Sequence, residues 1–272
     1  MRQFIRNLLP PLLWRGLYGL RWFGHARYGL FGEYPSWDEA MRVSTGYDSK
    51  IILEKTKAAL LRVKNGEAVY ERDSVTFSEV QYAWPLLACL MWVAAQSGGK
   101  LNVLDFGGSL GSTYFQNQTF LRSLVEVRWN IVEQAHYVKT GKEYFENGHL
   151  RFYESIETAV ERALPNVVLL SSVLQYLERP YDLLKKLLGL RFGYIIIDRT
   201  PFWDGSADRL CVQKVPPSIY TASYPCWIFS SKRFRENLQD AKIIAEFTSP
   251  DRLEAPVPCT WKGMITVPVG KS

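Results

Sequence analysis

A glycine-rich turn behind an acidic residue is the part of this sequence best suited to bind a ligand. Asp105 ends an apolar run, and Gly107, Gly108 and Gly111 come directly after it. Glycine lacks a Cβ, so the backbone can turn sharply and a ligand can approach the main chain. A dinucleotide fingerprint, G-x-G-x-x-G, would need glycine where Phe106 stands. A carboxylate here would repel a pyrophosphate and attract a cationic amino group, which favours a zwitterionic, sulfonium-bearing cofactor over NAD or FAD.

A second acid stands at the spacing expected for a ribose ligand. Residues 127–133 are predicted to form the next strand, and Glu133 at its end lies about 20 residues after Gly111. An acid at this distance can accept hydrogen bonds from both ribose hydroxyls. Either feature alone is typical of an ordinary solvated turn. The two together predict a site for a nucleoside-type cofactor.

The chain continues with alternating strands and helices. Further strands are predicted over 150–153, 166–171 and 194–198, and helices over 134–147, 155–163 and 174–188. Residues 243–247 and 263–267 alternate apolar and polar side chains and are predicted to form a closing antiparallel pair. The predicted fold is a Rossmann-like, doubly wound α/β sheet of seven strands, mostly parallel and covered on both faces.

These motifs resemble the class I S-adenosylmethionine-dependent methyltransferases. The strings that carry the resemblance are L-D-F-G-G-S-L-G-S (104–112), I-V-E-Q (131–134), L-S-S-V-L-Q-Y-L (170–177) and I-I-D-R-T-P-F (196–202). More narrowly, residues 37–229 resemble bacterial methyltransferases associated with surface-polysaccharide biosynthesis. That resemblance rests on S-T-G-Y-D (44–48), V-Q-Y-A-W-P-L-L (80–87) and V-P-P-S-I-Y (215–220). It implies the class I methyltransferase fold and S-adenosylmethionine (SAM) as cofactor, and it leaves the acceptor undefined.

The resemblance also implies which residues bind SAM. They are Asp105, Gly107, Gly108, Ser109, Gly111, Glu133, Gln134, Ser155, Ser171, Ser172 and Tyr82. The glycine turn would surround the methionine part, and Glu133 would hold the ribose with Gln134 beside the adenine. Ser155 would contact the adenine amino group, although an acid or an aromatic residue is common there in the wider superfamily. Ser171 and Ser172 would lie near the sulfonium, and Tyr82 would reach the cofactor from a helix before the sheet.

Catalytic candidates stand at the carboxyl ends of the later strands, where ligands bind in open α/β sheets. Methyl transfer is a direct displacement, so the enzyme must align the reactants and, for a hydroxyl acceptor, remove a proton. Asp198 is a candidate base and Arg199 a candidate for a bidentate contact with an acidic acceptor, unless the two only stabilise their own turn. Tyr176 also qualifies by position. His136, three residues after Glu133, is the best-placed histidine, although a role at the start of a helix suits it better.

Other chemistries lack the residues that they need. The four cysteines contain no C-x-x-C pair, and no two histidines stand at the spacing of metal ligands, so we expect no metal site. No phosphate-binding G-x-x-x-x-G-K-[ST] loop occurs, which weakens the case for a kinase.

Three parts of the chain are expected. They are a basic aromatic segment (1–36), a helical cap (37–99) with helices over 50–64 and 77–96, and the Rossmann-like domain (100–272) with an insertion (201–229). The insertion precedes a helix predicted over 231–239 and is expected to be a lid or an acceptor-binding loop. Four of its aromatic residues would stack on a sugar ring or simply pack the insertion, namely Trp203, Tyr220, Tyr224 and Trp227.

The N-terminal segment bears on the choice of partners. Residues 1–34 combine arginines with aromatic residues, their apolar runs are too short for a membrane span, and they lack a signal cleavage site. This pattern suits an interfacial helix on an anionic membrane, or docking on a protein surface. The net charge of +6 would fit nucleic acid, but no RNA-binding signature occurs and much of the excess lies in this segment. We therefore expect a cytoplasmic protein, peripheral at the inner membrane, without a nucleic-acid partner.

The function predicted from the sequence is SAM-dependent O-methylation of a sugar or a glycan precursor. A small-molecule or natural-product methyltransferase shares every cofactor feature and differs only in its acceptor. A non-catalytic methyltransferase-like partner in a membrane-associated assembly stays open because no base is obvious. An RNA methyltransferase is a weaker alternative, which a steep salt dependence of nucleic-acid binding would reveal.

Overall fold

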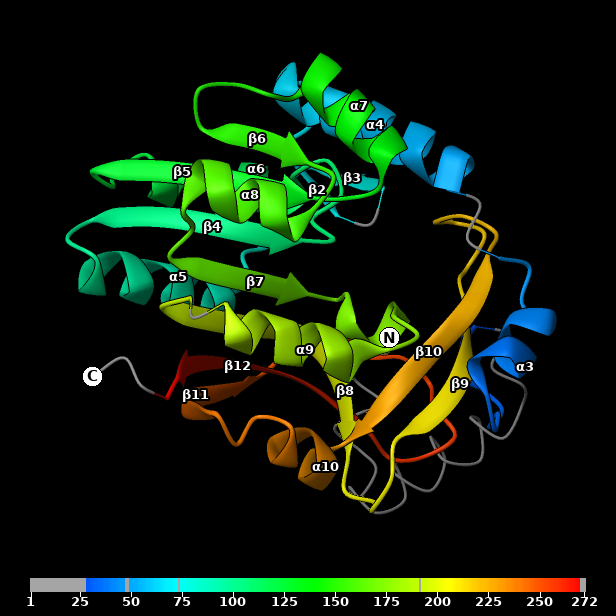
Figure 1. Cartoon of the computed structure of the whole chain (residues 1–272). Coiled ribbons are helices and arrows are strands. Elements are labelled where there is room, and N and C mark those ends of the chain that lie inside the picture. The colour runs from blue at the N-terminus through cyan, green and yellow to red at the C-terminus, as the bar shows by residue number, and fades with distance from the viewer. Residues whose placement is uncertain (1–27, 47–48, 73, 191, 270–272) are drawn as a thin grey trace, which may run out of the picture.

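A mostly parallel β-sheet forms the centre of the protein. The computed structural model describes residues 28–46, 49–72, 74–190 and 192–269. The parallel strands are β4 (Lys100–Phe106), β5 (Glu126–Val132), β6 (Leu150–Tyr153), β7 (Val167–Ser171) and β8 (Tyr194–Trp203). They stand in the order β6-β5-β4-β7-β8. Beyond β8 come β12 (Thr260–Pro268), which is antiparallel to β8, and then β11 (Ala241–Thr248), which is antiparallel to β12. These seven strands confirm the predicted Rossmann-like α/β fold (Figure 1).

Helices cover both faces of this sheet (Figure 1). They are α4 (Ser49–Lys64), α5 (Trp84–Gln96), α6 (Ser112–Leu121), α7 (Ala135–Tyr144), α8 (Ile156–Ala163), α9 (Pro180–Gly189) and α10 (Ser231–Glu236). The strand side chains alternate between the two layers, as a sheet buried on both faces requires. In β7, Val167 and Leu169 pack in the cluster on the α4–α7 side, whereas Val168 and Leu170 pack with the later helices.

The predicted helix over 174–188 is wrong in its first part. A 3-10 turn, η1 (Leu174–Tyr176), comes first, and α9 begins only at Pro180. Proline has no N–H and disfavours helical geometry in the residue before it, so the helix starts at the proline. This break leaves Tyr176 in a short turn at the end of β7.

The sheet has three strands that the sequence did not indicate. They are β1 (Gly29–Phe31), β9 (Arg209–Lys214) and β10 (Ser223–Ser230). Strand β8 continues past its predicted end, and Phe202 and Trp203 pair in parallel with Phe229 and Ser230 of β10. Strand β9 is antiparallel to β10, and β1 to β9. The insertion expected as a loop is therefore a β-hairpin that extends the sheet.

The segment before the sheet is not wholly helical either. It contains α3 (Trp37–Arg42), α4 and α5, but also a small antiparallel pair, β2 (Tyr70–Arg72) and β3 (Val75–Phe77). Helix α5 accordingly starts at Trp84 and not at residue 77. Each strand of the pair is only three residues long, which is too short for a clear alternation in the sequence.

The expectation for the N-terminal segment lies mostly outside the described residues. Residues 1–27 are not described, and of the rest of the segment residues 29–31 form β1. None of the helices within the described part of the chain has the length and apolar character needed to cross a membrane.

Candidate functional site

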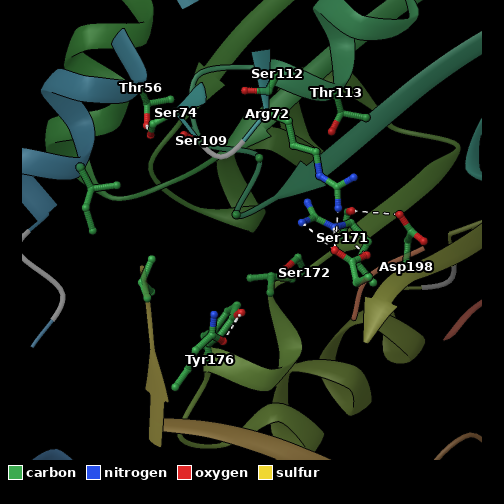
Figure 2. A pocket seen from close by; sticks show the side chains of 18 of the residues that line it. Thr56, Arg72, Ser74, Ser109, Ser112, Thr113, Ser171, Ser172, Tyr176 and Asp198 are labelled. Carbon is green, nitrogen blue, oxygen red and sulfur yellow. Dashed lines mark hydrogen bonds and ion pairs between the residues drawn. The ribbon is translucent and has the colours of Figure 1, made fainter. Parts of the chain in front are cut away.

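A cavity of about 740 Å³ lies at the carboxyl ends of β4, β5, β7 and β8. Most of the residues predicted for the site line it, namely Asp105, Gly107, Gly108, Ser109, Glu133, Gln134, Ser171, Ser172, Tyr176, Asp198 and Arg199. Figure 2 shows Arg72 of β2 reaching towards Ser171 and Asp198. The cavity thus joins the predicted cofactor residues to the predicted catalytic ones.

The glycine turn is held by its own backbone. The N–H of Gly107 donates to the carbonyl of Val132 at 3.0 Å, which fixes the turn to the end of β5. Gly107 has a φ of +73° and Gly111 a φ of +100°, a region that side chains with a Cβ rarely adopt. Ser109 adopts a φ of 54° as well. Gly111 is buried and begins α6, so it shapes the turn without lining the cavity.

Asp105 lies directly beneath Gly108. Its side chain is buried, and Oδ2 accepts a hydrogen bond from Trp129 Nε1 at 2.9 Å. Burial raises the pKa of Asp105 to about 7, and the nearby Glu133 adds to this, while the Trp129 bond works against it. That Asp105 binds an ammonium group stays a prediction.

The raised pKa of Asp105 predicts an unusual pH dependence of stability. Its folded-state pKa of about 7 exceeds the ordinary 3.8, so ionisation opposes folding increasingly as the pH rises from about 4 to 7. Asp105→Asn removes that charge and keeps an oxygen for Trp129. We expect the stability of the variant relative to wild type to rise by roughly 2–3 kcal/mol between pH 5 and pH 8. Chemical denaturation at both pH values measures this, and an unchanged difference would show an ordinary carboxyl pKa.

Glu133 bridges the second strand and the glycine turn. Its Oε1 accepts from the Ser109 N–H at 3.3 Å and its Oε2 from the Gln134 N–H at 2.9 Å. Burial raises the pKa of Glu133, and the two backbone bonds oppose this rise. A carboxylate in this place can accept hydrogen bonds from vicinal hydroxyls of a ligand in the cavity.

Asp198 ends the part of β8 that pairs with β7. Its side chain is buried, and Oδ2 accepts a hydrogen bond from Ser171 Oγ at 3.2 Å. Burial raises the pKa of Asp198, although Arg199 and the Ser171 bond lower it in part. A carboxyl with a raised pKa holds a proton more readily than an ordinary aspartate. That property suits a proton acceptor.

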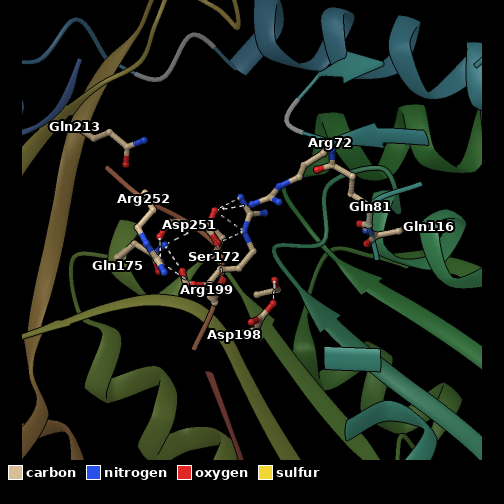
Figure 3. A network of polar contacts seen from close by, with 12 residues as sticks. Arg72, Gln81, Gln116, Ser172, Gln175, Asp198, Arg199, Gln213, Asp251 and Arg252 are labelled. Carbon is tan, nitrogen blue, oxygen red and sulfur yellow. Dashed lines mark hydrogen bonds and ion pairs between the residues drawn. The ribbon is translucent and has the colours of Figure 1, made fainter. Parts of the chain in front are cut away.

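Arg199 belongs to a network that sequence reasoning missed in part. Its Nε and Nη2 donate to the Asp251 carboxylate, which also pairs with Arg72 Nη2 at 2.6 Å (Figure 3). Arg72 comes from β2, and its neighbour Glu71 accepts a hydrogen bond from Ser112 Oγ at the start of α6. No local sequence pattern points to these residues, because Arg72 and Asp251 stand 179 positions apart.

Tyrosines from two elements form another wall of the cavity. Tyr176 Oη donates to Gln213 Oε1 at 2.8 Å, and its ring packs edge-on against Tyr224. Tyr220 and Tyr224 also line the cavity. Trp203 and Trp227 do not, because Trp203 packs under Arg209, and Trp227 donates to the Leu177 carbonyl and stacks on Trp37. These four aromatic residues of the insertion therefore divide into two that line the cavity and two that pack elsewhere.

Three further predicted residues do not line the cavity. Ser155 caps α8 by accepting from the Thr158 N–H at 3.2 Å. Tyr82 packs on Trp84 and Phe120. His136 lies in the first turn of α7 beside Tyr137, and its Nε2 is buried without a hydrogen-bond partner among the described residues. Their roles in binding or catalysis stay predictions.

The turn also matches a hydrolase motif, because residues 107–111 read G-G-S-L-G, a form of G-x-S-x-G. Ser109 would be its nucleophile, which needs a histidine base. Neither histidine within the described part of the chain lines the cavity. The same part contains no cluster of His, Cys, Asp or Glu arranged to hold a metal ion.

Comparisons with known proteins find matches among solved structures only. No protein-family model and no curated protein matches the sequence. Among solved structures, the N-terminal domain of EvdMO1 with SAH and D-fucose matches at a TM-score of 0.46 and 13% identity, over 82% of this chain and 97% of that chain. Magnesium protoporphyrin IX methyltransferase (ChlM) from Synechocystis PCC 6803 with SAM gives 0.45 and 13% over 82% and 99%.

A third solved structure matches at a similar level. The [4+2]-cyclase SpnF gives a TM-score of 0.47 and 12% identity, over 90% of this chain and 100% of that chain. Similarities this low carry no argument about substrate or reaction, and function has to be argued from the site.

Proposed function

We propose that this protein uses SAM to methylate an oxygen atom of a sugar or a glycan precursor. The observation that carries the cofactor assignment is the Glu133 carboxylate, which is bonded to the Ser109 N–H of the glycine turn at the rim of one large cavity. The strand order, with antiparallel β12 between β8 and β11, supports the assignment as the methyltransferase form of the Rossmann-like sheet.

The residues around the glycine turn fit SAM chemically. Glu133 would accept hydrogen bonds from the ribose hydroxyls, with Gln134 beside it at the cavity wall. Asp105 places negative charge under the turn, whereas a dinucleotide site must attract a negatively charged pyrophosphate. The cavity volume of about 740 Å³ lies in the ordinary range for sites of small ligands. When bound, SAM would supply a methyl group activated by its sulfonium.

Side chains at the ends of β7 and β8 would remove the proton and position the acceptor. A hydroxyl acceptor must lose its proton as the oxygen is methylated, and Asp198 is the carboxylate of the cavity wall whose burial favours taking that proton. Ser171 donates to Asp198 Oδ2 and orients it. Arg199 would position the acceptor, and the Tyr176 and Tyr220 rings offer faces on which a sugar can stack.

Binding of SAM tests the proposal directly. In Glu133→Ala the ribose loses a charged hydrogen-bond acceptor, so we expect affinity to fall about 5- to 150-fold, which corresponds to about 1–3 kcal/mol. Isothermal titration calorimetry with SAM on wild type and variant measures this. Glu126→Ala is the matched control, because Glu126 lies at the other end of β5 and pairs with Arg128.

Two outcomes would contradict the assignment. A folded wild type that binds no SAM would overturn the cofactor and with it the reaction. Equal affinity in the wild type and Glu133→Ala would move the ribose site elsewhere. Once binding is established, incubation with SAM and a panel of sugars, sugar acids and sugar phosphates, followed by mass spectrometry for a gain of one methyl group, identifies the acceptor.

A further inference from the structure

The positive charges of the cavity gather away from the glycine turn. The basic residues that line it are Arg72, Arg199, Lys214 and Arg252, and they belong to the β2–β3 hairpin, β8, β9 and the segment after β11. The lining acids on the side of the glycine turn are Asp105, Glu133 and Glu71, whose carboxylate accepts a hydrogen bond from Ser112 Oγ at the start of α6. The cavity thus has an acidic end, suited to a cation and to hydroxyls, and a basic end.

Among the described residues that line the basic end, positive charges outnumber acids. Asp251 is shared by two guanidinium groups, with Arg72 Nη2 at 2.6 Å and Arg199 Nη2 at 3.2 Å from Oδ1. Asp198 is the second acid of this end, so two acids stand against four basic residues. Arg252 contacts only main-chain carbonyls of Ser249 and Asp251 among its hydrogen bonds in the described structure. A net positive charge remains on this wall.

The two arginines of this network face the cavity and are held in place. Arg72 and Arg199 keep 29% and 22% of their side chains exposed, and Asp251 keeps 13%. Ser249 Oγ donates to Asp251 Oδ2 at 2.6 Å, so the shared carboxylate is itself fixed. Arg199 also has a φ of 52°, a backbone conformation that is unfavourable for a residue with a side chain and that clusters at binding sites. Figure 3 shows both guanidinium groups converging on Asp251.

We propose that the acceptor carries an oxyanion, a carboxylate or a phosphate, that binds to Arg72 and Arg199. This inference rests on the proposed function and names its substrate class. Planar guanidinium groups match oxyanions with paired N–H donors, and a partly enclosed site strengthens these charge-assisted bonds. Asp251, which lines the cavity as well, holds the two guanidinium groups close together. The ring of the acceptor then lies towards Tyr176 and Tyr220, which line the same cavity.

A purely structural role is the competing explanation. The Arg72–Asp251 pair ties the β2–β3 hairpin to the segment after β11, and that alone could account for it. The two explanations differ in one measurable respect. A structural tie changes stability when it is removed, whereas an oxyanion site also changes the affinity for anions in a protein that stays folded.

Calorimetry on the full chain saturated with S-adenosylhomocysteine tests the proposal. The probes are inorganic phosphate, glucose 6-phosphate, glucuronate and glucose, titrated at constant ionic strength set by chloride. We expect inorganic phosphate or at least one of the two anionic sugars to bind at least tenfold more tightly than glucose. Preference for glucuronate or for glucose 6-phosphate tells which oxyanion the acceptor carries.

Variants locate the site. We expect Arg72→Gln and Arg199→Gln each to weaken anion binding at least tenfold with unchanged affinity for S-adenosylhomocysteine. Arg179→Gln is the matched control, since Arg179 also pairs with an aspartate, Asp182, but 78% of its side chain is exposed and it lies outside the cavity. If Arg199→Gln does not fold, the anion affinity of Arg72→Gln and the preference of the wild type for anions over glucose decide the question.

Three results would overturn the proposal. The first is that anions bind no more tightly than glucose, and the second is that both variants keep the wild-type affinity for anions. The third is that Arg179→Gln loses as much anion affinity as Arg72→Gln and Arg199→Gln. If the proposed function itself is wrong, S-adenosylhomocysteine does not bind to the protein, whether or not the anions bind.

Discussion

Gly108→Ala is expected to abolish SAM binding, with a loss of at least about a hundredfold in affinity, while the fold survives. A Cβ at this position would lie 2.4 Å from Oδ2 of Asp105 and 2.5 Å from its Cγ. The φ of Gly108 is not in the left-handed region, so the backbone itself could accept alanine. The obstacle is the carboxylate alone.

The carboxylate has little room to move. Asp105 is 2% exposed and its Oδ2 is bonded to Trp129, which is fully buried. To admit the methyl group, either the Trp129 bond breaks and leaves a buried carboxyl without its donor, or the turn shifts away from Glu133. Overpacking of this kind costs about 1–3 kcal/mol of stability. The shift also displaces the Ser109 N–H and the Glu133 carboxylate that faces it, which is where the ribose is proposed to bind.

Calorimetry with SAM and thermal unfolding together check this prediction. Gly148→Ala is the control, because no atom lies within 4 Å of a Cβ built there and the residue belongs to an exposed turn. It should leave both quantities unchanged. Wild-type affinity in Gly108→Ala would mean that the turn is not part of the cofactor site.

The sequence indicated the central sheet well because burial on both faces leaves a plain signal. Strand β7 is a run of apolar residues flanked by polar ones, so it could be placed to within a residue, and the apolar run that ends at Asp105 corresponds to β4. The acid after β5 followed from its spacing. These signals are local, and the site residues that they indicated line one cavity in the structure, with the exception of Gly111.

The remainder of the site depends on contacts between distant parts of the chain. Arg72 and Asp251 meet only because the β2–β3 hairpin reaches over the sheet, and no pattern near either residue records this. Ser155 stands where an adenine contact was expected, yet its hydroxyl caps α8, a use that its sequence position allows equally. The β9–β10 hairpin was missed because its prolines and tyrosines resemble a loop more than they resemble strands.

Asp198→Asn is expected to lower the rate of methyl transfer 100- to 10,000-fold, once an acceptor is known, with SAM affinity unchanged. Asparagine keeps an oxygen for Ser171 and fills the same volume, so only the ability to take a proton is lost. Because the pKa of Asp198 is raised, the wild-type rate should fall as the pH drops through that pKa and the carboxylate becomes protonated. The residual rate of the variant should lack this dependence.

Asp208→Asn separates this effect from the general cost of removing a buried aspartate. Asp208 is 4% exposed and accepts from Tyr181 Oη and the Ser230 N–H, but it does not line the cavity. Its substitution should reduce stability and leave the rate unchanged. If Asp198→Asn keeps the wild-type rate and pH profile, the proton of the acceptor leaves by another route, and Asp198 only positions Ser171 and the end of β8. A site with an oxyanion-bearing acceptor then still stands, because its binding rests on Arg72 and Arg199 and not on the base.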